Sequence, residues 1–420
     1  MTIINWGLLG PDKLESERRT RTLGLAVAVR AFNDLAVPNL GGVKFSKNVF
    51  LACLGIHVAE KVRLEGKQVS NIQVANAIEA LGCILSFEKN NWQSDERLRG
   101  NSKLAGAKDL SYKVVGANNY YVTQPMRMAT VQLLPGLGLV ESQGERFNSY
   151  SLNDNGLKLV IAGCADFKCY NSSIVNFLVK WVLGNHRSPR VSGLIKALAP
   201  IYSLAADAKA ILKDRLVSGN DESALRRRNA LTWVSNINTN PCINWRKPSE
   251  LTDLHFKDIK SGAYFFILRD SVMLLLDAIE TAVANEKSGS LDLRKGIPLD
   301  LQNALTRVKS AATSFVNLSH DPTPDKLALS FARECLQSQD ELIILSVVER
   351  DNLVLKVRDR AVIKGSAFGG VQQEEANEAG ETESLFPKGV SFRFWNLYLL
   401  NIDFNVQPNM WLNKKEKADE

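Results

Sequence analysis

The spacing of apolar residues predicts that most of this chain is helical. Over residues 45–66, apolar side chains recur every three or four positions, which is the period of a helix with one buried side. The same spacing follows Ser70, a residue type that often caps helices, over SNIQVANAIEALGCIL. Residues 87–120 have no period and are rich in Asn, Gly, Lys and Arg, so we expect a long basic loop there with one short helix.

A further helix is predicted over residues 123–135. Thr123 can cap it, and Pro125 then stands in the first turn, where proline costs no hydrogen bond. The apolar residues of this segment share one face of a helix, and Gly136 and Gly138 are expected to end it.

A β-hairpin is predicted directly after this helix. Residues 139–142 and 146–152 are two short extended runs, and the tight-turn sequence Gln143-Gly144-Glu145 separates them. Asn153 or Asp154 then caps another helix.

The order helix, glycine break, hairpin with a basic residue, and helix over residues 120–161 resembles the winged helix-turn-helix of MarR-like and PadR-like regulators. That resemblance implies that helix 123–135 lies in the DNA major groove and that the hairpin at 139–152 forms the wing. The resemblance covers roughly 40 to 110 residues, depending on whether the helices at 45–84 are its scaffold. The long loop before Thr123 departs from the family pattern.

The rest of the chain is also mainly helical in pattern. The most apolar stretch, 263–284, contains three charged residues and is therefore expected to be a buried core helix rather than a membrane span. In 340–365, helical spacing up to Val347 gives way to alternation, which suggests a strand or a hairpin around Arg350-Asp351-Asn352. Residues 391–406 are aromatic and β-prone, and we expect them to pack on the body as a terminal strand or helix.

These patterns together predict a mainly α protein with an N-terminal winged helix. The expected parts are a helical and winged-helix domain at 1–165, an α-helical domain at 166–370, an acidic flexible linker at 371–387, and a C-terminal segment at 388–420 that packs on the body.

Composition narrows the class of protein. Hydrophobic residues make up 45% and charged residues 23%, which excludes a wholly disordered or fibrous chain. The six cysteines are scattered in mostly apolar settings, and the start lacks a secretory pattern, so we expect free thiols and a cytoplasmic location. Residues 1–370 carry 47 basic and 36 acidic side chains, a balance that suits an anionic partner.

The basic residues also occur in clusters that could hold phosphates. One cluster is Arg18, Arg19 and Arg21, another is Arg97, Arg99, Lys103 and Lys108, and a third is Arg226, Arg227 and Arg228. Within the winged-helix segment, the groove-facing residues would be Gln124, Arg127, Met128 and Val131, with Arg146 on the wing.

Signals for catalysis or metal binding are incomplete. The chain has no phosphate loop, no nucleophile elbow and no His-Glu-x-x-His. Cys164 and Cys169 with His186 lack a fourth zinc ligand.

Two further partial patterns are weighed as enzyme signals. Asp166 and Lys168 imitate half of a magnesium-dependent nuclease site, with Asp154 as the nearest second carboxylate. His255 and Lys257 imitate a His-x-Lys motif whose other elements are missing, so surface polarity is the better interpretation of that pair. We therefore expect no cofactor and no metal.

The expected function is non-enzymatic binding of double-stranded DNA, in which the winged helix and the basic clusters hold the duplex. A scaffold subunit that uses the winged helix for protein contacts is the alternative, and a metal-dependent nuclease is the second alternative. The chain is larger than a simple regulator and is loosely similar to accessory proteins of bacterial anti-phage defence operons. Other protein subunits are therefore expected partners, and a membrane is not.

Overall fold

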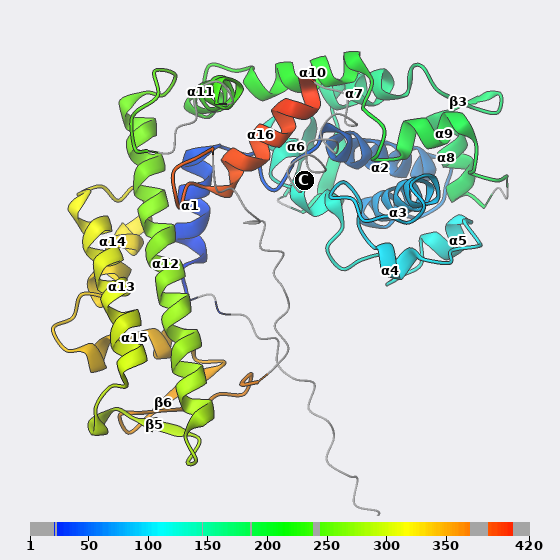
Figure 1. The fold of residues 1–420 in the computed structure, drawn as a ribbon. Coiled ribbons are helices and arrows are strands. Elements are labelled where there is room, and N and C mark those ends of the chain that lie inside the picture. The colour runs from blue at the N-terminus through cyan, green and yellow to red at the C-terminus, as the bar shows by residue number, and fades with distance from the viewer. Residues whose placement is uncertain are drawn as a thin grey trace, which may run out of the picture. The chain divides into compact units, whose positions relative to one another are not determined.

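The computed structural model describes residues 21, 23–144, 146–184, 187–237, 244–369 and 385–405. It is mainly helical, as predicted, with 60% helix and 6% strand in small antiparallel sheets (Figure 1). Within the described residues, no helix combines the length and the apolar character that crossing a membrane requires. The chain divides into two compact units. The larger unit comprises the described residues of 33–256, 384–387 and 391–420, and the smaller unit comprises those of 1–32, 257–383 and 388–390.

This division does not fall after residue 165, where the sequence analysis places a domain boundary. Helix α2 (Ser46–Leu64) packs against α7 (Asp154–Cys164) and also against α8 (Ile174–Val182). Helix α10 (Ala206–Val217) packs on α7 as well. Elements from both sides of residue 165 thus share one core, because each of them needs the others to cover its apolar face.

Helices α2 and α3 (Asn71–Lys89) form the centre of the larger unit and confirm the first two predicted helices. Ser70 caps α3, since its side chain accepts a hydrogen bond from the backbone N–H of Gln73. The two helices approach closely at Gly55, where an added Cβ would lie 2.5 Å from the Cβ of Ala75. A larger residue at this position would push the helices apart.

The predicted hairpin is confirmed. Strand β1 (Val140–Ser142) pairs antiparallel with β2 (Tyr150–Leu152). Helix α7 follows, and its cap is Asn153, whose side chain accepts from the N–H groups of Asn155 and Gly156. The loop predicted at 87–120 contains two short helices rather than one, α4 (Asn101–Leu104) and α5 (Tyr112–Val115).

The predicted helix at 123–135 is wrong as a continuous α-helix. The chain forms a 3₁₀ helix, η1 (Met126–Thr130), and then a single turn, α6 (Leu133–Gly136). Pro135 explains the break, because in a continuous helix it would leave the carbonyl of Val131 without its N–H donor and would clash with that carbonyl. The hydroxyl of Tyr150 donates to the Val131 oxygen instead, at 2.9 Å.

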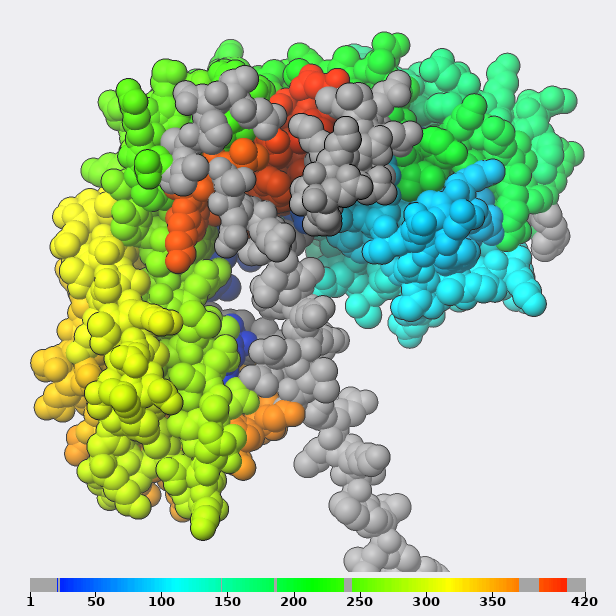
Figure 2. Space-filling view, in the orientation of Figure 1, coloured from blue at the N-terminus to red at the C-terminus, as the bar shows by residue number. Residues whose placement is uncertain are grey.

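The β-prone segment near the C-terminus is also a helix, α16 (Phe392–Asn405). It packs on α10 and on α11 (Glu222–Asn236), as expected for a segment that returns to the body. Phe394 is buried and its ring meets that of Trp233 edge to face, 4.7 Å between centroids. Part of α16 is visible at the surface in orange and red (Figure 2). Packing of the aromatic residues decides the helix over their β-propensity.

The larger unit also contains a small hairpin and a further short helix. Strands β3 (Lys168–Cys169) and β4 (Ser172–Ser173) form a small hairpin, and α9 (Ser192–Leu198) packs on α3.

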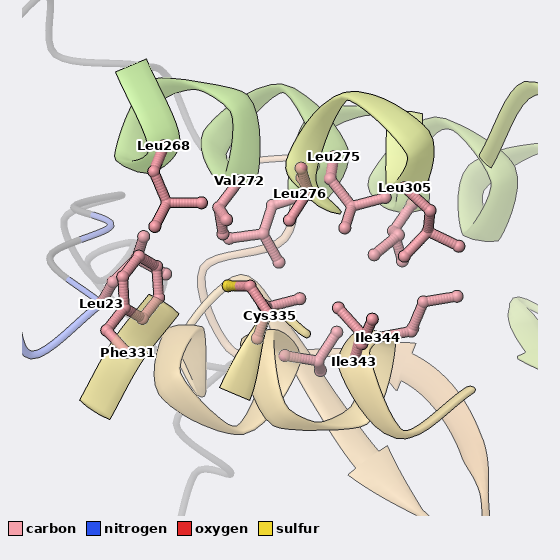
Figure 3. Packing of buried hydrophobic residues seen from close by; sticks show 14 of the residues in the cluster. Leu23, Leu268, Val272, Leu275, Leu276, Leu305, Phe331, Cys335, Ile343 and Ile344 are labelled. Atoms are coloured by element: carbon pink, nitrogen blue, oxygen red, sulfur yellow. The ribbon is translucent and has the colours of Figure 1, made fainter. Parts of the chain in front are cut away.

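The smaller unit is built on α12 (Asp253–Asn285), which confirms the predicted core helix at 263–284. Its apolar residues face side chains of α13 (Leu299–Asn317), α14 (Leu327–Glu334) and α15 (Asp340–Asp351) (Figure 3). The labelled core includes Leu268, Val272, Leu275, Leu276, Leu305, Phe331, Cys335, Ile343 and Ile344.

A three-stranded antiparallel sheet completes this unit in the order β5-β7-β6, with β5 (Ser290–Asp292), β6 (Leu355–Arg358) and β7 (Ala361–Lys364). The hairpin predicted around Arg350–Asn352 lies later in the chain, because α15 continues through Asp351. Its turn is Asp359-Arg360, both with positive φ (49° and 61°), as in the type I′ turn that suits twisted strands.

Candidate nucleic-acid interface

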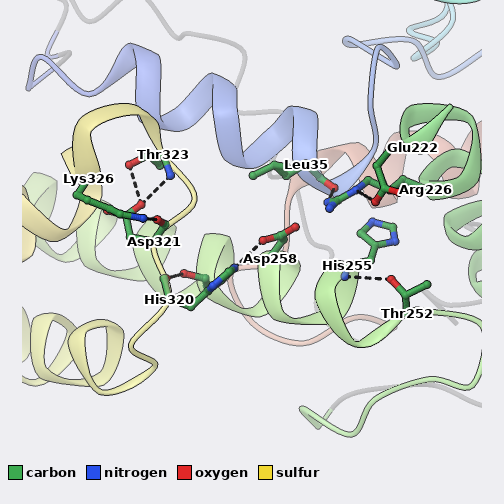
Figure 4. Close-up of polar contacts among 11 residues, drawn as sticks. Leu35, Glu222, Arg226, Thr252, His255, Asp258, His320, Asp321, Thr323 and Lys326 are labelled. Carbon is green, nitrogen blue, oxygen red and sulfur yellow. Dashed lines mark hydrogen bonds and ion pairs between the residues drawn. The ribbon is translucent and has the colours of Figure 1, made fainter.

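The three consecutive arginines of α11 stabilise helix ends rather than forming an exposed basic patch. Arg226 is 5% exposed, pairs with Glu222 at 2.8 Å, and donates to the carbonyl of Leu35 at 2.9 Å (Figure 4). Leu35 belongs to the last turn of α1 (Ala26–Ala36), where backbone carbonyls have no partner within the helix. The next two carbonyls, of Ala36 and Val37, accept from the ring Nε2 of His255 and from Arg393.

The other two arginines secure the end of α10. Arg227 is 3% exposed and its Nε donates to the carbonyl of Leu216 at 2.8 Å. Arg228 is half-buried and donates to the carbonyls of Val217 and Gly219. The prediction that all three residues contact phosphates is therefore wrong for Arg226 and Arg227, whose charges lie inside the larger unit.

Arg97 is likewise structural. It is 6% exposed, holds Asp95 through two nitrogens, at 3.0 and 2.7 Å, and donates to the carbonyl of Ile201. Arg99 and Lys103 are exposed, although each donates to nearby backbone carbonyls, Lys103 to that of Tyr121 at 2.7 Å. Of the four residues of this cluster, Arg99, Lys103 and Lys108 are exposed where a ligand can reach them.

In the N-terminal cluster, Arg18 and Arg19 lie outside the described residues. The side chain of Arg21 is 4% exposed in the smaller unit and forms ion pairs with Asp277, Glu280 and Asp351. This arginine stabilises the unit and is not available to an external anion.

Arg127 occupies a different kind of position. Its guanidinium lies over the ring of Phe147, 5.2 Å from the centroid, and its Nε donates to the side-chain oxygen of Asn76 at 2.5 Å. Phe147 comes from the hairpin connection and Asn76 from α3, so two elements orient one half-buried arginine. An arginine that is held in this way loses little conformational entropy when it binds an anion.

Glu79 fixes the backbone beneath Arg127. Its two carboxylate oxygens accept from the N–H groups of Met126, at 2.6 Å, and Arg127, at 3.0 Å. Glu79 is 2% exposed. Burial raises the pKa of the Glu79 carboxyl, and hydrogen bonds from these N–H groups and from Tyr121 oppose the rise without cancelling it. The carboxylate serves as the cap of η1.

The hairpin is attached to the N-terminal end of α3. The side chain of Asn71 donates to the carbonyls of Phe147, at 3.1 Å, and Tyr150, at 2.8 Å, while Asn148 accepts from the backbone N–H of Ile72. These contacts bring the hairpin and η1 to the same end of α3.

One surface therefore combines four of the predicted contact residues, and we call it the hairpin surface. It consists of Gln124, Arg127, Met128 and Arg146. Gln124 and Arg146 are exposed, and Met128 is 51% exposed. Arg146 directly precedes Phe147, on which Arg127 lies. The structure thus brings Arg127 onto the residue that follows Arg146, whereas it places Arg97, Arg226 and Arg227 elsewhere in the interior.

The pattern of residues also contained a signal that the sequence analysis missed. Glu79 interrupts the apolar run ANAIEALG, and a single acid in such a run indicates a buried polar partner. Asn76 and Phe147 carried no comparable signal in the sequence. Each orients Arg127 only because the hairpin is attached to α3.

The partial catalytic patterns gain no support from the geometry. Asp166 and Lys168 are exposed, and the described residues contain no group of three His, Cys, Asp or Glu side chains that could hold a metal ion. His186 lies outside the described residues. His255 is fully buried rather than on the surface, so its expected role as surface polarity is wrong.

A histidine–carboxylate pair in the smaller unit has a structural explanation. His320 Nε2 lies 2.6 Å from the carboxylate of Asp258, whereas the hydroxyl of Ser261 donates to the backbone carbonyl of His320 (Figure 4). The hydroxyl therefore does not engage the ring, and this is not the arrangement of a Ser-His-Asp nucleophile. Both contacts join α12 to the loop that follows α13.

The five described cysteines, Cys53, Cys83, Cys164, Cys169 and Cys335, are free, and burial raises the pKa of each thiol. Raised thiol pKa values disfavour the reactive thiolate. These residues behave as small apolar side chains.

No protein-family model, no curated protein and no solved structure matches this chain.

Proposed function

We propose that the protein binds double-stranded DNA without acting on it chemically, and that the hairpin surface contacts the phosphate backbone. The observation that carries this proposal is the placement of Arg127 against Phe147, beside the exposed Arg146. Two arginines on one surface can contact neighbouring phosphates, and arginine is well suited to phosphate recognition. The excess of basic residues in the first 370 positions favours approach to the same polyanion.

Backbone contacts are favoured over reading of the base sequence. An element that enters the major groove is normally a helix of several turns, and η1 contains only five residues before the break at Pro135. The base-reading residues of this surface would be Gln124 and Arg127. The Nε of Arg127 already donates a hydrogen bond to Asn76. Binding should therefore depend strongly on salt and weakly on sequence.

The proposal is tested by measuring DNA affinity against salt concentration for the wild type, Arg127→Ala and Arg146→Ala. Loss of one phosphate contact should reduce the slope of log affinity against log salt by about 0.9 and weaken all sequences alike. We expect this result for Arg146→Ala. Arg127→Ala should weaken binding at least as much, because Arg127 is held in place before binding. Gln124→Ala should have an effect only on sequences that the protein prefers.

Lys89→Ala provides the matched control. Lys89 is an exposed cation at the C-terminal end of α3, whereas the hairpin is attached at the N-terminal end of that helix. Its replacement should leave the salt slope unchanged. Coincident curves for the wild type and both arginine variants, or no wild-type binding at about 50 mM salt, would refute DNA binding through this surface.

A scaffold function is the second candidate, and Met128 favours it. A methionine that is 51% exposed beside two arginines suits a protein partner, because methionine and arginine are both enriched in protein interfaces. Under this alternative the hairpin surface binds another subunit of a multi-protein complex. It becomes the better explanation if the wild type binds no duplex at about 50 mM salt.

A further inference from the structure

The smaller unit contains a basic depression at the end of its three-stranded sheet. The depression has a volume of about 860 Å³ and is lined by residues 284–290 and by Ile363 and Lys364. Two exposed lysines, Lys287 and Lys364, contribute to it from the turn before β5 and from β7. The hydroxyls of Ser288 and Ser290 lie 3.2 Å apart in the same lining.

The turn that carries Lys287 lies beside Lys364 of β7. Gly289 has φ +65°, and a Cβ added there would lie 3.5 Å from Cε of Lys364. The ammonium of Lys364 lies over the ring of Phe368, 4.9 Å from its centroid. Lys364 thus lies against the ring of Phe368 and beside the turn at Gly289.

The register of the sheet separates Lys356 from Lys364, because Lys364 is opposite Leu355 and alternates with Ile363 along β7. Lys356 on β6 is opposite Ile363 on β7, and Ile363 is opposite Ser290 on β5. Directly opposite residues of an antiparallel pair project from the same face, so Lys356, Ile363 and Ser290 form one row across the outer face. The neighbouring row, Val357, Val362 and Leu291, contributes to the core instead.

We propose that this depression binds phosphate groups, with Lys287 and Lys364 as the cations and Ser288 and Ser290 as hydroxyl donors. The acid in the lining is Glu286, so the cations exceed the acids there. Lysine ammonium groups and serine hydroxyls together satisfy the oxygens of a phosphate. Lys356 has another explanation, because a charge on edge strand β6 blocks pairing with another chain. That explanation does not apply to Lys287 in a turn or to Lys364 on the central strand.

The phosphate can come from a nucleic-acid backbone or from a free phosphate compound, and two probes distinguish these sources. The full chain is titrated with inorganic pyrophosphate at low ionic strength and, separately, with a duplex of about 20 base pairs over a range of salt. The test variant carries both Lys287→Gln and Lys364→Gln, and Lys356→Gln is a control because Lys356 lies on the other face of the sheet. Arg307→Gln is the matched control, because Arg307 is an exposed cation on α13 of the same unit.

The double variant should weaken pyrophosphate binding at least about tenfold, while Lys356→Gln and Arg307→Gln have no effect. If the duplex is also weakened and its salt slope falls by about two, the site serves a nucleic-acid backbone. If only pyrophosphate is affected, the site serves a free phosphate compound. The inference is overturned if neither probe distinguishes the double variant from the wild type, including the case in which the wild type binds neither.

These outcomes are independent of the hairpin surface. The lysine variants change only the smaller unit, whereas Arg127→Ala and Arg146→Ala change only the larger one. Loss of DNA binding in one set and not in the other identifies which of the two proposals fails.

Discussion

Many cationic side chains of this protein act as donors to carbonyls at helix ends. Arg226 donates to the last turn of α1, Arg215 donates to the carbonyl of Leu137 after α6, and Lys47 donates to the carbonyl of Ala197 in α9. The last carbonyls of a helix lack partners within it and carry partial negative charge, so a cation nearby is favourable. Basic clusters in the sequence therefore overstate the number of cations that can reach a ligand.

Lys47 gives a prediction at the scale of a single residue. It is 3% exposed, and burial lowers its pKa from 10.5 to about 8. Between these two values the unfolded chain binds a proton that the folded chain does not, so the folded state gains stability as the pH rises from 8 to 10.5. Below pH 8 both states carry the proton, and the full cost of burying the charge is present.

The measurement compares the wild type with Lys47→Met, which removes the titration and keeps an unbranched side chain that is one atom shorter. The free energy of unfolding of the wild type minus that of the variant should rise by about 3 kcal/mol between pH 8 and 10.5. The variant also loses the hydrogen bond to Ala197, but that loss does not depend on pH. A difference that stays constant over this range would contradict the prediction.

At the scale of elements, the segment between α3 and α7 shows how neighbours replace local hydrogen bonds. Pro135 prevents a continuous helix, and Tyr150 from the hairpin satisfies the carbonyl of Val131 that the break exposes. Glu79 from α3 caps the other end of η1. The hairpin surface therefore depends on three elements that meet at the end of α3.

The contact between α7 and the hairpin gives a prediction at this scale. A Cβ added at Gly156 would lie 2.1 Å from the carbonyl oxygen of Leu139, a distance that real contacts do not reach. Gly156→Ala must therefore displace α7 from the hairpin, and we expect it to lower the free energy of unfolding by at least about 2 kcal/mol.

Gly144→Ala is the control for this substitution, because its nearest neighbour would be the Ser149 hydroxyl at 3.7 Å, an ordinary contact. Urea unfolding of the two variants checks the pair. Equal stability of Gly156→Ala and Gly144→Ala would show that α7 does not pack on the hairpin in this way.

At the scale of the whole molecule, each unit has its own apolar core, and among the described residues neither core contains a metal cluster or a disulfide. We expect the melting temperature to stay unchanged after treatment with a metal chelator and, separately, with a thiol reductant. A structural zinc ion or disulfide would contribute several kcal/mol to stability. The melting temperature of the whole chain is measured by thermal unfolding with and without each reagent. A clear fall with either one would contradict this expectation.

The sequence by itself determined most of the helices, because their apolar period is local information. It also determined the hairpin at 139–152 and the cap of α7, since turn residues and Asn153 act within a few positions of themselves. The core helix at 263–284 followed from its apolar content, which only a buried position can accommodate.

Tertiary structure alone decided three other features. Phe392–Asn405 is a helix because its aromatic residues pack on Trp233 and its neighbours, which outweighs their β-propensity. Arg97 and Arg226 are buried where they donate to carbonyls of distant segments, those of Ile201 and Leu35, whereas Arg146 remains exposed at the hairpin. Arg127 shares a surface with Arg146 only because the hairpin is attached to α3 in the folded protein. A side chain's accessibility depends on which segments fold over it, and that information is not local to the residue.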